Sequence, residues 1–126
     1  MANLTIGPKV RKPLHLHDRK LKSLEKRAVQ IREDLIDMLV EAGSGHSAGP
    51  LGMADIFTAL YFHVLVHDPK KPSWKDRDRL ILSNGHICPI RYVTMAHAGY
   101  FPKKELMTLR KLGSRLQGHP ELEFFE

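Results

Sequence analysis

The chain has 126 residues, and its content of 42% hydrophobic and 27% charged residues is that of one globular domain, which excludes a disordered or fibrous chain. Twenty Lys and Arg against fourteen Asp and Glu give a formal net charge of +6, which favours anionic partners: phosphorylated small molecules, nucleic acid or an acidic membrane surface. One cysteine, no leader-like apolar region and no apolar run near 20 residues predict a cytoplasmic protein without a disulfide or a membrane span.

The first part of the chain divides into an arm and a helix. Residues 1–17 contain prolines and several basic side chains without helical or alternating periodicity, which predicts an extended basic arm. From Asp18, a candidate N-cap, apolar residues recur at steps of three and four. This spacing predicts an amphipathic helix over residues 18–42 that ends at Gly43. We therefore expect the arm to be followed by one domain over residues 18–126.

The middle of the chain alternates between glycine-rich and apolar segments. Four glycines and a proline make residues 43–53 a predicted loop, and a second helix is expected over residues 53–66. The short apolar run at residues 80–82 ends directly in Ser, Asn and Gly. Such a run is typical of a buried strand in a parallel sheet.

Two more helices are predicted after this strand. One covers residues 89–98 and is closed by Gly99, and the other covers residues 103–112, with Pro102 at its start. A lone strand cannot satisfy the hydrogen-bonding groups of its own backbone. The expected fold is therefore α/β, mostly helical with one or two parallel strands, and incomplete as a single chain.

Three histidines each follow a glycine at the boundary of a predicted element: His46, His86 and His119. Glycine lets a ligand approach the backbone closely, and imidazole donates or accepts a proton near neutral pH. The loop of Gly85 and His86 also joins the end of the predicted strand to the start of a helix, where open α/β sheets bind ligands and phosphate groups. These loops are the candidate site, and a structural role of each histidine is the alternative.

The other polar residues indicate weaker alternatives to this site. The three histidines are too far apart in sequence for a local zinc finger, and Cys88 is a lone thiol, so no metal ligands are assigned. His63 and His67, spaced i, i+4, are expected to share a helix face as an exposed or half-buried pair. Binding of nucleic acid by the basic arm and first helix is a minor alternative, which a gel shift at low salt would test.

Four segments in order resemble the N-terminal section of transketolases. They are residues 44–46 (SGH) with 49–55 (GPLGMAD), 78–86 (DRLILSNGH), 99–102 (GYFP) and 116–121 (LQGHPE). The resemblance covers about residues 20–123, in the family's order and spacing, and is similar to the split transketolases encoded by two genes. It implies that the chain is the first part of a thiamine-diphosphate-binding domain.

The resemblance implies a transferase of the pentose phosphate pathway that moves a two-carbon ketol unit between sugar phosphates. The implied cofactors are thiamine diphosphate with Mg²⁺ or Ca²⁺. By similarity, His86 and Gly85 bind the cofactor, with His86 at its diphosphate. His46 and His119 are the implied catalytic residues, which bind the hydroxyls of the substrate and assist proton transfer.

The resemblance also implies what this chain lacks. The family's Gly-Asp-Gly metal motif and its pyrimidine-binding half do not occur in these 126 residues, so the chain is expected to be truncated before the metal motif and inactive alone. A homodimer or higher assembly, or pairing with a separately encoded remainder, is expected to complete it. The alternatives are a non-catalytic assembly module and an enzyme of the deoxyxylulose-phosphate synthase type.

Overall fold

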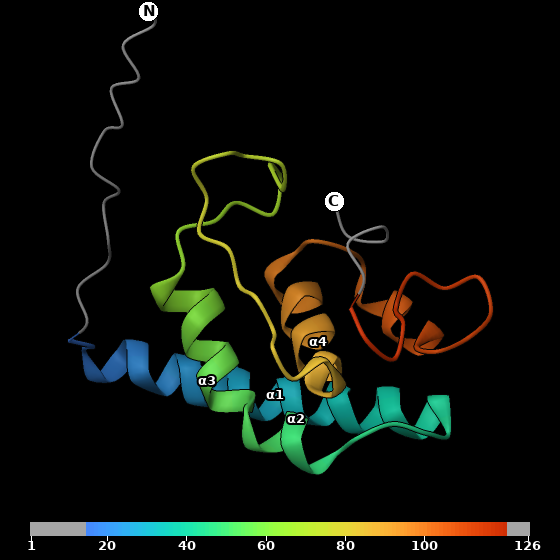
Figure 1. Ribbon diagram of the computed structural model, residues 1–126. Helices are drawn as coiled ribbons and strands as arrows, with labels where there is room; N and C mark the ends of the chain where they lie inside the picture. Colours follow the sequence, from blue (N-terminus) through green and yellow to red (C-terminus); the bar gives the residue numbers. More distant parts are fainter. Residues whose placement is uncertain (1–14, 121–126) are drawn as a thin grey trace, which may run out of the picture.

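One long helix, α1 (Asp18–Ala42), runs along one side of the molecule, and the other helices pack against it (Figure 1). The computed structural model describes residues 15–120. The predicted basic arm therefore falls almost wholly outside the described residues, and the division into an arm and a domain stays a prediction. The elements after α1 are α2 (Ala48–Gly52), α3 (Ala54–Ala59), the π-helical turn η1 (Leu60–Val64), the 3₁₀ turn η2 (Gly85–Ile87), α4 (Cys88–Ala98) and the 3₁₀ segment η3 (Lys103–Thr108).

The first helix forms as its apolar spacing predicts. The predicted stripe runs from Leu21 to Ala42, and five of its side chains are buried: Leu24, Ala28, Ile31, Leu35 and Met38. Leu21 is instead 45% exposed, and Ala42 is half-buried. The helix ends at Gly43, whose φ of 64° is left-handed and whose N–H donates to the carbonyls of Leu39 and Val40. One detail differs, because His17 is the N-cap and Asp18 is the first helical residue, where its carboxylate still suits the helix dipole.

The segment after the first helix is more helical than its composition suggests. α2 lies inside the predicted glycine-rich loop, and the helix predicted over residues 53–66 is divided into α3 and the π-helical turn η1. Proline is compatible with the first turn of a helix, so Pro50 does not prevent α2 from forming. The glycines of this segment give no apolar periodicity, so the sequence pattern predicted a loop where α2 forms.

The predicted strand is absent from the structure. None of the residues from 15 to 120 forms a strand, and residues 80–82 have irregular backbone between the loop after η1 and the turn η2. Leu80 and Leu82 pack partly against the core, while Ile81 is 87% exposed. A strand needs a neighbouring strand to accept its backbone hydrogen bonds, and the described part of the chain offers none. The described part is therefore helical rather than α/β.

The last helices surround the centre of the core. α4 begins one residue earlier than predicted, ends at Gly99 with a φ of 96°, and buries most of its side chains. The helix predicted over residues 103–112 is only the 3₁₀ segment η3, which ends at Thr108 because Leu109 has a non-helical ψ of 126°; Arg110 then takes a left-handed φ of 60°. No helix in the described range, 15–120, is both long and apolar enough to cross a membrane.

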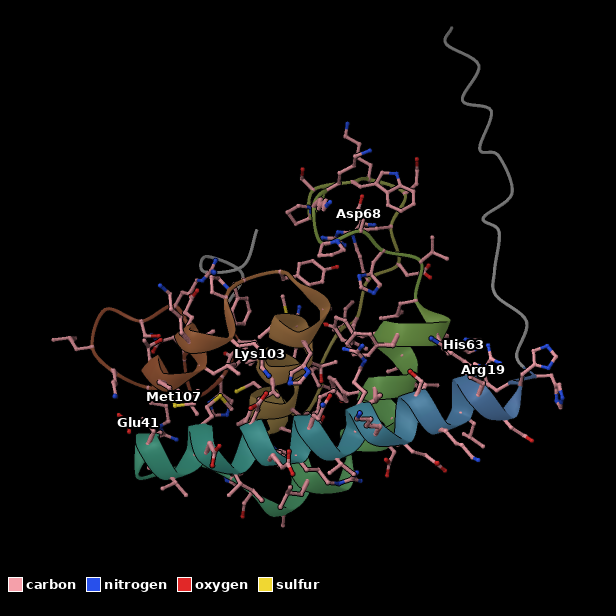
Figure 2. All side chains as sticks on the ribbon, turned by 180° about the vertical axis from the view of Figure 1, so that it is seen from behind. Arg19, Glu41, His63, Asp68, Lys103 and Met107 are labelled. Atoms are coloured by element: carbon pink, nitrogen blue, oxygen red, sulfur yellow. The ribbon has the colours of Figure 1, made fainter. Side chains whose placement is uncertain are left out.

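A buried histidine links three of these elements. His97 of α4 donates from Nε2 to Oδ2 of Asp34 on α1 at 2.6 Å. Lys103 of η3, which is labelled in Figure 2, contacts the same oxygen at 2.6 Å. Burial lowers the pKa of His97, and the bond to Asp34 opposes this only in part. Burial acts to raise the pKa of Asp34, but the hydrogen bonds from Lys103 and His97 leave that pKa below its ordinary value.

Lowering the pH from 7 to 5 is expected to reduce the free energy of unfolding through His97. Its folded pKa lies below 6.5, so between that pKa and 6.5 the unfolded chain binds more protons, and stability falls as the pH falls through this window. The positive charges of Lys103 and Arg27 act in the same direction. Urea unfolding of the wild type and His97→Gln at both pH values measures the effect. An equal pH dependence in both proteins would contradict it.

Candidate functional site

Two of the three glycine–histidine loops meet at one place. His46 lies between α1 and α2, and His86 lies in the turn η2 that leads into α4. Their ring centroids are 5.1 Å apart, with the rings inclined by 63°. Both side chains are exposed, so a ligand can reach them.

The third loop joins them through Gly85. A Cβ atom at Gly85 would lie 2.9 Å from Cδ2 of His119, which is shorter than the distances that Cβ atoms keep from other atoms in proteins. Glycine is therefore needed here for the His119 ring to lie against the backbone that precedes His86. His119 is also exposed, so the three imidazoles gather at the start of α4 with access to solvent.

A second glycine brings the first loop to this position. A Cβ atom at Gly49 of α2 would lie 2.9 Å from Cγ2 of Ile87, the residue after His86. The close approach lets the short helix α2 pack against the start of α4 with Pro50 buried. The loop that carries His46 is thereby placed next to His86.

Side chains of α4 hold the third loop. The Cys88 thiol lies 3.1 Å from the carbonyl oxygen of Gly118, and the Tyr92 hydroxyl donates to that of Gln117 at 2.8 Å. Burial raises the pKa of Cys88, so the thiol stays protonated and acts as a donor. These two carbonyls immediately precede His119, and residues 109–120 have no helix or strand to fix them.

Positive charge lies beside the histidines. The Arg110 guanidinium is 3.5–3.7 Å from where a Cβ of Gly118 would stand, and the Arg110 N–H donates to the carbonyl of Leu116 at 2.8 Å. The cradle at Gly85, the exposed imidazoles and this guanidinium fit an anionic group such as a diphosphate. The first residues of α4 add the positive end of its helix dipole.

The described residues offer no comparable metal site. Within 15–120, no three side chains of His, Cys, Asp or Glu are grouped so that they could hold a metal ion. The predicted pairing of His63 and His67 on one helix face is wrong, because η1 ends at Val64. His63 is buried, and His67 donates to the Tyr61 carbonyl and accepts from the Tyr100 hydroxyl, each at 2.7 Å.

Sequence reasoning selected the three histidines and Gly85 but not the residues that assemble them. Gly49 and Arg110 carry no pattern of their own in the sequence. The i, i+4 spacing of Cys88 and Tyr92 on a predicted helix could have indicated a shared face, although not its target. The catalytic and cofactor-binding roles of His46, His86, His119 and Gly85 stay predictions.

The sequence of this domain matches a known protein family. The profile of a family described as "Transketolase, thiamine diphosphate binding domain" matches residues 24–126. The site thus lies in the class of domains that bind thiamine diphosphate. The match covers most of the chain, and the chain belongs to the transketolase family.

Individual relatives agree with the family. Transketolase 1 of Escherichia coli is 42% identical over 105 residues, which are 82% of this chain and 16% of that protein. A 6-deoxy-6-sulfo-D-fructose transketolase subunit of a Clostridium species is 38% identical over 99 residues, 79% of this chain and 36% of that subunit. Among solved structures, transketolase from Leishmania mexicana has a TM-score of 0.75 at 37% identity, covering 85% of this chain and 15% of the other. The chain therefore spans about a sixth of the full-length transketolases.

Proposed function

We propose that this chain forms the diphosphate-binding side of a transketolase that transfers a two-carbon ketol unit between sugar phosphates of the pentose phosphate pathway. The observation that carries this proposal is the convergence of three glycine–histidine loops on the start of α4, with His46 and His86 5.1 Å apart. Family membership and the positive charge beside the loops support it.

The chain's own residues have distinct roles in this proposal. Thiamine diphosphate, held with Mg²⁺ or Ca²⁺, supplies the nucleophilic carbon of the reaction. His86 would donate a hydrogen bond to the diphosphate, and Gly85, the second proposed cofactor-binding residue, lets the His119 ring lie against the backbone next to it. His46 and His119 bind substrate hydroxyls, and each can hold or release a proton there near neutral pH.

The proposed partner is the remainder of the enzyme. The Clostridium relative is named as a subunit, which supports pairing with a separate part or a second copy of this chain. Ile81 and Val40 are 87% and 75% exposed and would be covered in such an assembly. The proposed location is the cytoplasm, and without its partner the chain is proposed to be inactive.

A chimaera tests the function directly. Residues 15–120 would replace the matched segment of the Escherichia coli transketolase, and ketol transfer would be assayed with thiamine diphosphate, Mg²⁺, a ketose phosphate and an aldose phosphate. The chimaera is expected to be active, and His119→Ala within it is expected to lower kcat by about 10²-fold or more, because general acid–base groups contribute that much. His15→Ala, an exposed histidine away from the site, is the control.

The isolated 126-residue chain is compared with the chimaera, to test whether it needs a partner. Calorimetric titration with thiamine diphosphate and Mg²⁺ is expected to show binding weaker than micromolar, since the described residues provide no metal-binding group to neutralise the diphosphate. Micromolar binding by the chain alone would contradict its dependence on a partner. A chimaera that folds but is inactive would instead favour the non-catalytic assembly module.

A further inference from the structure

Two side chains of α4 reach neighbouring backbone carbonyls in the third loop. Cys88 and Tyr92 lie one helical turn apart, and both are fully buried. The Cys88 Sγ is 3.1 Å from the Gly118 oxygen and 3.5 Å from the Gln117 oxygen, while the Tyr92 hydroxyl donates to the Gln117 oxygen at 2.8 Å. The same face of the helix therefore binds two successive peptide groups.

These carbonyls belong to the two residues before His119, so their position limits where that imidazole can lie. On its other side, His119 is in contact range of Gly85, which precedes Cys88 by three residues. The turn η2 thus supports the His119 ring, and α4, which follows it directly, holds the backbone that carries this ring. His86 also lies in η2, so these two consecutive elements set the relative position of two of the three imidazoles.

The alternative is that these hydrogen bonds only satisfy buried polar groups. The backbone of residues 109–120 is neither helix nor strand, so no regular pattern of backbone hydrogen bonds holds this segment in place. Leu109 and Leu116 are buried and anchor the segment upstream of Gln117. Beyond Leu116, Gln117 also donates to the carbonyls of Ser114 and Arg115, but these bonds lie within the loop. The bonds from Cys88 and Tyr92 are those that tie this stretch to α4.

We propose that Cys88 and Tyr92 are positioning residues, which hold His119 against Gly85 by binding the carbonyls of Gln117 and Gly118. The role of His119 in catalysis rests on the function proposed above, whereas its position does not. Neither side chain contacts substrate or cofactor in this proposal, and both act through the backbone of the loop.

Nuclear magnetic resonance of the full 126-residue chain tests the position without any ligand. The readout is the cross-relaxation peak between His119 Hδ2 and the Gly85 Hα protons. Tyr92→Phe and Cys88→Ala are each expected to weaken the peak. The double variant is expected to lose the peak, while Cys88→Ser, which keeps a donor, is expected to retain it.

Thr94→Val is the matched control. Thr94 is also a fully buried residue of α4, and its hydroxyl donates to the Ile90 carbonyl at 2.7 Å, within the helix itself. Thr94→Val removes one buried hydrogen bond, as Tyr92→Phe does, but it is expected to leave the His119 peak unchanged. Tyr92→Phe removes a single oxygen atom and is therefore expected to fold. It tests the positioning of His119 even if the double variant does not fold.

A second readout separates positioning from folding. In the active chimaera, Tyr92→Phe is expected to lower kcat by about 10-fold, within the roughly 10²-fold that a misplacement of 1 Å can cost, with KM and cofactor affinity changed less than kcat. An unchanged His119 peak in a folded Tyr92→Phe or double variant would overturn the proposal. An inactive chimaera would count against the proposed function alone, because the peak is measured without substrate or cofactor.

Discussion

Replacing Leu35 by alanine is expected to lower the free energy of unfolding by about 2–5 kcal/mol. Leu35 is fully buried on the face of α1 that packs against the rest of the core. Truncation removes apolar contact and leaves a cavity that the helices lying across α1 can close only in part. Since small domains are stable by about 5–15 kcal/mol, the loss would unfold a large share of the chain at moderate urea concentrations.

The neighbouring residue supplies the control. Ile36 is 47% exposed on the same helix, and Ile36→Ala is expected to change stability by less than about 0.5 kcal/mol, the range of most surface substitutions. Urea unfolding followed by circular dichroism measures both variants. A large loss for Ile36→Ala that grows with protein concentration would show that another chain covers this face. A small loss for Leu35→Ala would contradict the packing of α1.

The sequence predicts α1 and α4 well because their signals are local. Both have a glycine that takes a left-handed φ at the end, and α1 has an apolar stripe that maps directly onto its buried face. The strand at residues 80–82 was predicted wrongly for the opposite reason. An apolar run indicates burial, but a strand requires a partner strand, and pairing is a non-local property that a run of three residues does not carry.

The site shows the same division between local and non-local information. Glycine before histidine is a local signal, and it selected the residues that the structure brings together. What brings them together is contact between distant segments: Gly49 against Ile87, and Cys88 and Tyr92 against the loop before His119. Such contacts depend on the packing of whole helices, so no spacing rule along the chain could have identified them.

Gly45→Ala is expected to destabilise the protein by about 1–3 kcal/mol, the cost of forcing a residue with a side chain into a sparsely populated backbone conformation. Gly45 has a φ of +123°, and a Cβ atom there would lie 2.8 Å from Cδ2 of Leu39. Both strain and contact would be relieved by moving the loop that carries His46. We therefore expect the His46 and His86 rings to separate, and the activity of the chimaera to fall.

Substitutions at two other glycines distinguish backbone strain from the contact with Leu39 as the cause of this destabilisation. Gly52 has no atom within 4 Å of an added Cβ and no left-handed φ, so Gly52→Ala is expected to be neutral or stabilising by up to about 1 kcal/mol. Gly43 has a φ of +64° but open space, so Gly43→Ala reports backbone strain without the contact with Leu39. Urea unfolding should rank the losses Gly45→Ala, then Gly43→Ala, then Gly52→Ala. Because Gly43 lies outside the site, only Gly45→Ala should also lower kcat, and an equal loss of kcat in both would mean that the loop conformation at Gly45 does not position His46.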